Sequence, residues 1–245
     1  MKVSLNEVQR VCEKAACGAG AAPGVDSDCG TIAAWLQSRE LPGIEIVAHA
    51  LGERIEHGDA PALACQERAG RTQYAGLGGR SLLLLSGALV DLVAARARRG
   101  PEVSSILEIH DARAPLSLLA MAASLSGVSM TLRWGRTLSE ISAAAQIEAP
   151  GQVTLFGETW QPVEDAGTVC LSIEGCTERP SKPSSLPPLL ASGALAERHQ
   201  RAIDLGLEVP DEPWHRLEQL AARTLVPATE ESRVRGAGAQ VSDNE

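Results

Sequence analysis

Aromatic residues and lysines are scarce in this 245-residue sequence. Only 2% of its residues are Phe, Trp or Tyr, three are lysines, and the formal net charge is −9. Proteins that bind nucleic acids need clustered Lys and Arg for the phosphates, and many stack bases on aromatic side chains. We therefore expect no nucleic-acid partner.

A continuous membrane-spanning run is also missing. Residues 114–132 carry no charge, but Pro115 and Gly127 interrupt them, and the pattern after Gly127 alternates. A spanning helix needs about 20 apolar residues in one run. We interpret this stretch as a buried helix followed by a buried strand, and we expect no membrane partner.

The six cysteines form no C-x-x-C pair and no Cys/His metal pattern. In a chain of this length we interpret them as thiols in a reducing compartment. Ser4 and Glu7 have the spacing of a helix capping box, so a helix is predicted where a secretory signal would lie. Together these features predict a cytoplasmic protein.

The common catalytic and nucleotide-binding motifs are absent, including the P-loop, the zinc-protease motif, the nucleophile elbow and the dinucleotide fingerprint. No two histidines have the spacing of three to five residues that is typical of metal ligands. We therefore predict no metal, and the sequence does not identify a cofactor.

The hydrophobic pattern predicts an α+β protein with three parts. Residues 1–178 are expected to form a core, residues 179–188 a proline-rich linker, and residues 189–245 a C-terminal helical arm that docks on the core. The core begins with three helices in series over about residues 1–60. Gly18 is placed where the first of these helices would need a left-handed residue to end.

The central part alternates between helix and strand and predicts a small sheet. Strands over residues 103–109 and 128–134, joined by a helix over 115–126, form one βαβ unit. Residues 152–156 and 158–161 are expected to pair as a hairpin about Gly157. A further strand over 168–174 turns Val169 inward, and two helices follow the linker, over 194–205 and 211–225.

One polar cluster lies where the first strand of the βαβ unit ends. Ligands of α/β sheets collect at the carboxyl ends of strands. His110 and Asp111 can serve there as a catalytic acid/base pair, and Arg113 can bind an anion. The alternative is a polar surface loop with an ion pair. His199, on the inner side of its helix, is interpreted as a packing residue.

The C-terminal end offers a second candidate ligand site. Arg233 and Arg235 precede Gly236 and Gly238, whose N–H groups can turn inward to form an anion-binding nest. The alternative is a solvated, fraying helix end.

The opening MKVSLNEVQRVCEKAACGAG, the central RAPLSLLAMAASLSGVSMTLRW and the ending LAARTLVPATEESRVRGAGAQVSDNE resemble a bacterial family of unknown function. This resemblance implies no activity, but it makes Arg233 to Gly238 part of a family pattern. The first helices and the segment GLEVPDEPWHRL resemble the malate/L-lactate dehydrogenase family, which uses nicotinamide cofactors. That family's Asp-Ser-His-Gly stretch is replaced by Pro42–Glu45, so no catalytic residue is carried over.

Two functional classes remain open. The absence of strong motifs favours a non-catalytic accessory protein that binds a protein partner. The cluster from Glu108 to Arg113 favours the alternative, an enzyme or enzyme subunit that acts on a small anionic metabolite, with the oxidoreductases as one possible class.

Overall fold

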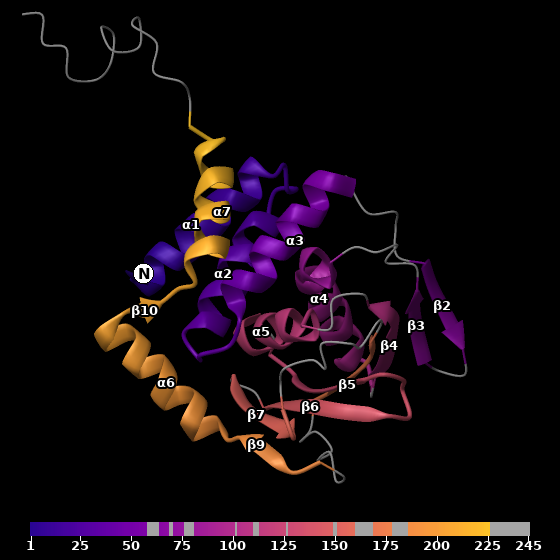
Figure 1. Cartoon of the computed structure of the whole chain (residues 1–245). Helices are drawn as coiled ribbons and strands as arrows, with labels where there is room; N and C mark the ends of the chain where they lie inside the picture. The colour runs from indigo at the N-terminus through magenta and orange to yellow at the C-terminus, as the bar shows by residue number, and fades with distance from the viewer. Residues whose placement is uncertain are drawn as a thin grey trace, which may run out of the picture.

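A mixed β-sheet and two layers of helices make up the structure. This computed structural model describes residues 1–57, 64–68, 71–75, 81–100, 102–109, 113–125, 127–148, 151–159, 169–177 and 186–225. One layer of helices lies on the sheet, and the N-terminal helices form a further layer above it (Figure 1). The predicted α+β class is confirmed.

Three N-terminal helices are present as predicted: α1 (Leu5–Gly18), α2 (Val25–Gln37) and α3 (Gly43–His57). The capping box is confirmed, because the Glu7 N–H donates to the Ser4 hydroxyl at 3.2 Å and the Ser4 N–H donates to the Glu7 carboxylate. These bonds satisfy amide groups that have no partner within the helix.

The predicted role of Gly18 is wrong. Gly20, with φ of +77°, adopts the left-handed conformation instead. A Cβ atom on Gly18 would lie 1.9 Å from the carbonyl oxygen of Leu220, so this position needs glycine for the close approach of α1 to the C-terminal helix. A local pattern does not reveal a contact between residues 202 positions apart.

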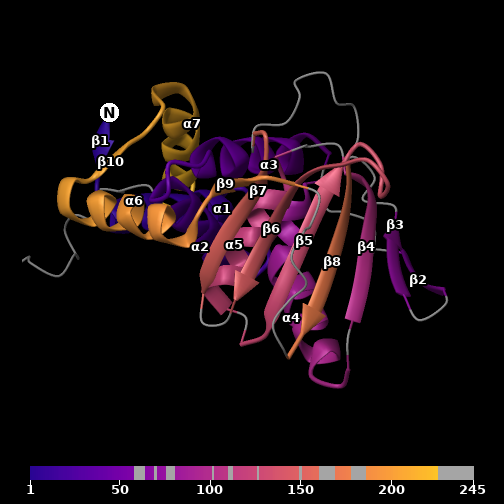
Figure 2. The ribbon, with the colours of Figure 1, turned by 90° about the horizontal axis from the view of Figure 1, so that it is seen from below.

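The described part of the chain forms a sheet of eight strands in the order β2-β3-β4-β8-β5-β6-β7-β9. Their bounds are β2 Ala64–Arg68, β3 Arg71–Ala75, β4 Glu102–Ile109, β5 Ser129–Gly135, β6 Ile141–Glu148, β7 Gln152–Gly157, β8 Val169–Cys176 and β9 Pro188–Leu190. Among the strand pairs of the described residues, only β3 and β4 run parallel. Figure 2 shows the strands from below.

The predicted βαβ unit is present, but another strand, β8, lies between its two strands. Helix α5 (Pro115–Leu125) connects β4 to β5. Both strands pair antiparallel with β8, which lies between them, so β4 and β5 run in the same direction without touching. The inward alternation of the last strand is confirmed, because Val169, Leu171 and Ile173 are buried.

The predicted hairpin about Gly157 is wrong. Strand β7 continues through Gly157, and it pairs with β6 and β9. The sequence concealed β6, because its centre is Ala143–Ala144–Ala145, and alanine has little preference for strands. The β6–β7 pair aligns six residues of each strand. The predicted partner, residues 158–161, would have aligned only four.

Helices α4 (Ser86–Ala97) and α5 cover one face of the sheet, and a short 3-10 helix, η1 (Leu82–Leu85), precedes α4. The hydroxyl oxygens of Ser86 and Ser117 lie 2.8 Å apart and join α4 to α5 in the interior. Helix α2 packs on the other side of α5. The sheet, this pair of helices and the N-terminal helices thus share one core.

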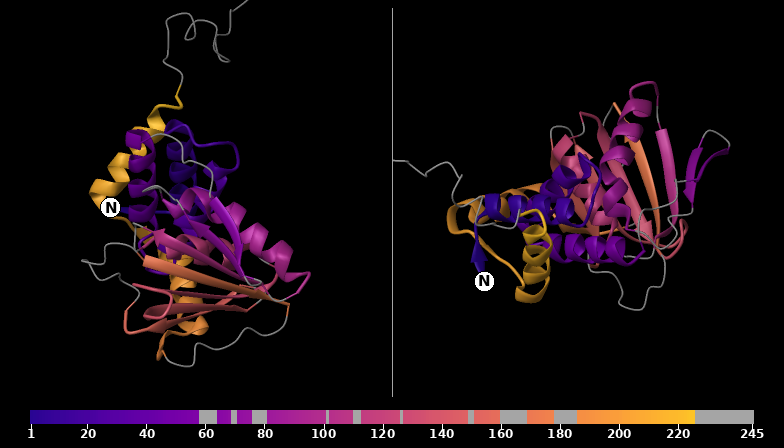
Figure 3. Two further views of the ribbon diagram at one scale, coloured as in Figure 1. Left: turned by 90° about the vertical axis from the view of Figure 1, so that its right-hand side faces the viewer. Right: turned by 90° about the horizontal axis from the view of Figure 1, so that it is seen from above.

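The C-terminal segment contacts both the sheet and the layer of N-terminal helices. After β9 at the sheet edge, helix α6 (Ser192–Leu205) leads to β10 (Leu207–Glu208), which pairs with β1 (Lys2–Val3). Helix α7 (Asp211–Ala222) then packs against α1 and α3 (Figures 1 and 3). The apolar side of α7 faces the N-terminal helices, and its residues Trp214, Leu217 and Leu220 are buried.

The division of the chain at residues 179–188 stays a prediction, because residues 178–185 lie outside the described ranges. Among the helices of the described ranges, none has both the length and the hydropathy needed to cross a bilayer.

Candidate functional site

The polar cluster predicted at the end of β4 is described only in part. Arg113 is half-buried just before α5, where its carbonyl accepts the Leu116 N–H at 3.0 Å. His110 and Asp111 lie outside the described residues. The strand-end site therefore stays a prediction.

The second predicted ligand site also stays untested. Arg233, Arg235, Gly236 and Gly238 all lie beyond Leu225, the last residue that the structure describes.

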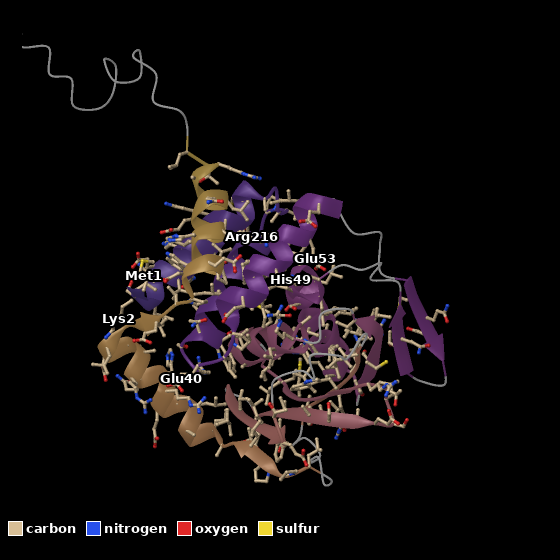
Figure 4. All side chains as sticks on the ribbon, in the orientation of Figure 1. Met1, Lys2, Glu40, His49, Glu53 and Arg216 are labelled. Atoms are coloured by element: carbon tan, nitrogen blue, oxygen red, sulfur yellow. The ribbon has the colours of Figure 1, made fainter. Side chains whose placement is uncertain are left out.

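The most completely described candidate is a hollow of about 480 Å³, here called the α2–α6 cleft. Its walls are the turn between α2 and α3, the β1–β10 pair and helix α6, and Figure 4 labels Lys2 and Glu40 on two of these walls. Cavities that bind small molecules have volumes of about 300–1,000 Å³. The charged residues that line it are Lys2, Glu40, Glu45, Arg198, Arg201 and Glu208.

The turn that follows α2 places a glutamate where glycine is usual. Leu41 N–H donates to the Leu36 carbonyl at 3.0 Å, five residues back, which is typical of a helix that ends in a left-handed residue. That residue is Glu40, with φ of +58°. For a residue with a Cβ atom this conformation costs about 1–2 kcal/mol. Such a conformation persists where the surrounding structure holds the residue in place.

The Glu40 carboxylate contacts two arginines of α6. Its Oε2 atom lies 3.4 Å from Arg198 Nε, and its Oε1 atom lies 3.2 Å from Arg201 Nη1. Arg198 also donates from Nη1 to the carbonyl of Arg39 at 3.2 Å. These contacts attach α6 to the α2–α3 turn across the cleft.

The Gln37 amide connects two other walls. Its Nε2 atom donates to the Glu208 carbonyl of β10 at 3.0 Å, and its Oε1 atom accepts the Ile44 N–H of α3 at 3.4 Å. Lys2 is the cross-strand partner of Glu208, and Glu45 follows Ile44. Gln37 therefore holds the strand that carries Lys2 in register with the helix that carries Glu45.

Two polar groups of the cleft lack partners among the residues that the structure describes. Glu45 Oε2 is buried and receives no hydrogen bond. The Lys2 ammonium forms no ion pair or hydrogen bond there. A buried polar atom without a partner is unfavourable, and functional sites are one place where such atoms occur. The cleft thus has a cation and a hydrogen-bond acceptor available to a ligand.

A second group of side chains lies beside the cleft. The Arg39 guanidinium stacks on Trp35, 4.1 Å from the ring centroid, and burial lowers the pKa of Arg39 to about 10. Burial and then the charge of Arg39 lower the pKa of His199, whose Nδ1 atom is buried without a partner in the described structure. This environment favours neutral His199.

The described residues contain no group of three His, Cys, Asp or Glu side chains arranged to hold a metal ion.

Sequence reasoning missed the residues of this cleft. Glu40 and Arg198 are 158 positions apart, and nothing in the local pattern joins them. One signal was present: Arg198 and Arg201 are three residues apart, so a helix places both on one side. Glu40 gave no such signal, because a charged residue between the end of α2 and Pro42 is typical of an ordinary surface turn.

Residues 3–74 match the family described as protein of unknown function (DUF3726), which confirms the resemblance to a family of unknown function over that part of the chain. A search of curated proteins gives no match.

Several solved structures share the fold. Malate dehydrogenase from Entamoeba histolytica is 8% identical, covers 93% of this chain and 99% of its own, and has a TM-score of 0.58. A dehydrogenase from Sinorhizobium meliloti is 15% identical, with 91% and 99% coverage and a TM-score of 0.60. A putative malate/lactate dehydrogenase from E. coli is 8% identical, with 95% and 97% coverage and a TM-score of 0.61. These likenesses confirm the resemblance in fold.

The preference for a non-catalytic accessory protein is contradicted. The three structures above and three further similar ones are all dehydrogenases or reductases. They support the enzyme alternative. The prediction was wrong because it treated the absence of catalytic motifs as a sign of a binding protein. A fold can persist at 8–15% sequence identity although no motif is recognisable.

Proposed function

We propose that the protein is an enzyme, or a subunit of one, that acts on a small anionic metabolite, and that the α2–α6 cleft binds this metabolite. The observation that carries the proposal is the combination of an available cation, Lys2, and a buried acceptor atom, Glu45 Oε2, in one hollow of about 480 Å³. A small acid that also has an N–H or O–H group satisfies both.

The oxidoreductases are the reaction class that the fold favours, because the similar structures are dehydrogenases and reductases. The position of the cleft agrees with this class. Pro42 and Glu45, which stand where the resemblance implies an Asp-Ser-His-Gly stretch, both line it. The next two residues, Ile46 and Val47, are fully buried, so Glu45 is the polar side chain that this segment offers to a ligand.

The fold also suggests a nicotinamide dinucleotide, but the N-terminus of α3, which borders the cleft, does not offer the usual site for its pyrophosphate. Proteins often bind a pyrophosphate with open N–H groups at a helix N-terminus. In the first turn of α3, Gly43 N–H donates to the Leu41 carbonyl, and Ile44 N–H donates to Gln37. We therefore derive no step through a dinucleotide in this cleft.

The residues of the chain have distinct parts in this proposal. Lys2 attracts the anionic ligand, which matters in a protein of net charge −9 because the general field repels anions. Glu45 accepts a hydrogen bond from the hydroxyl or amino group of the ligand. Gln37 is a positioning residue, since its amide holds the walls that carry these two groups.

The binding test is calorimetric titration with a panel of small mono- and dicarboxylic acids. Lys2→Met is expected to weaken the best ligand by about 1.5–3 kcal/mol, the contribution of a hydrogen bond to a charged group. Lys14→Met is the matched control, because Lys14 is an exposed lysine of α1 outside the cleft. Equal binding by both variants, or no binding of any acid, would refute the proposed site.

The activity test follows absorbance at 340 nm with each acid and an oxidised or reduced nicotinamide cofactor. We expect the parent protein to turn over at least one acid. Glu45→Gln should reduce this turnover, and Glu212→Gln should leave it unchanged. Glu212 is likewise in the first turn of a helix, but it is exposed and outside the cleft. Turnover of no acid by the parent protein would refute the oxidoreductase class.

The strand-end hypothesis is the second proposed location. It keeps His110 and Asp111 as an acid/base pair and Arg113 as the anion anchor, at the carboxyl end of β4. Arg113→Ala separates the two locations: it is expected to leave acid binding unchanged if the cleft is the site and to weaken it if the strand end is the site. The same titrations provide the answer.

A further inference from the structure

We infer that Arg198 and Arg201 form the carboxylate-binding site of the α2–α6 cleft, and that Glu40 occupies this site until a ligand carboxylate replaces it. The inference rests on the proposed function and adds to it the anchor of the ligand and the regulation of its affinity.

The first step concerns the two arginines. They lie three residues apart on α6, so their side chains project from the same side of the helix. Both line the cleft, and each contacts a different oxygen of one carboxylate, at 3.4 Å and 3.2 Å. Two guanidinium groups that share one carboxylate in this way form a site that favours anions, because hydrogen bonds and ion pairs between charged groups are stronger than those between neutral groups. The pair already binds the chemical group that a small acid would bring.

The second step concerns the ease of exchange. The side chain of Glu40 is 54% exposed, and those of Arg198 and Arg201 are 27% and 60% exposed. An ion pair open to solvent contributes at most about 1 kcal/mol, so the two pairs together hold Glu40 only weakly. A ligand carboxylate can therefore take the place of Glu40 with small loss, and the displaced side chain remains in water.

The third step concerns the turn. Glu40 holds the left-handed position that glycine occupies best, with φ of +58°. Among the residues that the structure describes, it is the one non-glycine residue with positive φ. A glutamate in this position is unfavourable for the backbone, and its side chain reaches the arginines. The structure assigns Glu40 the role of an internal competitor for the anion site.

The test measures malonate binding by calorimetry to the parent protein and to Glu40→Gln. Removing the competitor is expected to tighten malonate binding about tenfold, which corresponds to about 1.4 kcal/mol. Malonamide, which has the shape of malonate without its charge, is expected to bind the two proteins equally. In the double variant Glu40→Gln/Arg201→Gln the gain should be lost.

Glu208→Gln is the matched control. It removes one negative charge from the same cleft, but only the backbone carbonyl of Glu208 makes a contact there, with Gln37. A change of less than about threefold is expected. If Glu208→Gln tightens malonate binding as much as Glu40→Gln, the effect is general charge and the inference is overturned. Glu40→Gly, which suits the left-handed turn, repeats the test if Glu40→Gln folds poorly.

The outcomes also separate this inference from the proposed function. If the parent binds malonate and Glu40→Gln binds it no better, the inference is overturned while the binding site stands. If Glu40→Gln binds malonate and the parent turns over no acid, the competitor role is supported while the oxidoreductase class is refuted. If neither protein binds malonate, the inference is overturned.

Discussion

Trp214→Ala tests whether the C-terminal arm folds as one unit with the core. Trp214 is 1% exposed and lies on α7, the helix that packs against α1 and α3. Its Nε1 atom has no acceptor among the described residues, so the substitution removes apolar packing without breaking a hydrogen bond seen there. Truncation of a buried Trp to Ala costs about 3–5 kcal/mol. This is a large fraction of the roughly 5–15 kcal/mol by which a typical domain is stable.

The assay is urea unfolding, followed by circular dichroism and by fluorescence of the three remaining tryptophans, Trp35, Trp134 and Trp160. Trp35 lies on α2 and Trp134 on β5, so they report on the N-terminal helices and the sheet. With a dependence of about 3 kcal/mol per molar urea, the midpoint is expected to fall by about 1–2 M. Both signals should shift together, because the arm and the core share one transition.

Leu225→Ala is the control, since Leu225 is 67% exposed and its truncation should change stability by less than about 0.5 kcal/mol. An unchanged fluorescence midpoint in Trp214→Ala, with early loss of part of the helical signal, would refute the reasoning. The arm would then unfold by itself.

Three further predictions concern single sites. Gly206→Ala should destabilise the protein by about 1–3 kcal/mol in thermal or urea unfolding, because Gly206 has φ of +78° and ψ of 177°, a backbone conformation that is nearly confined to glycine; an unchanged midpoint would contradict this. Asp26→Asn should speed alkylation of the exposed Cys17 at pH 8, because the hydrogen bond to the Asp26 carboxylate raises the pKa of the thiol, and an unchanged rate would count against that bond. The free energy of unfolding should fall as the pH drops through about 6.5, because the pKa of His199 is lowered in the folded protein and the unfolded chain therefore binds a proton at this residue more readily. His199→Gln should lessen this loss of stability between pH 7 and pH 5. An equal loss in the variant and the parent would disprove the prediction.

The sequence by itself determined the elements whose hydrophobic pattern is strong. The apolar stripes of α1 and α7 and the alternation in β5 and β8 follow from side-chain periods of 3.6 and 2 residues. These periods depend on neighbours in the chain, so they are legible without the fold. Strand β6 was missed because its run of alanines has no such period.

Only the tertiary structure decided which of these elements meet. It inserted β8 between β4 and β5, brought Leu220 against Gly18, and placed the arginines of α6 beside Glu40. Contacts between residues more than 150 positions apart depend on how whole faces pack, and no local window contains that information. The α2–α6 cleft consists of such contacts, so the chemistry of the candidate site became visible only when the chain was folded.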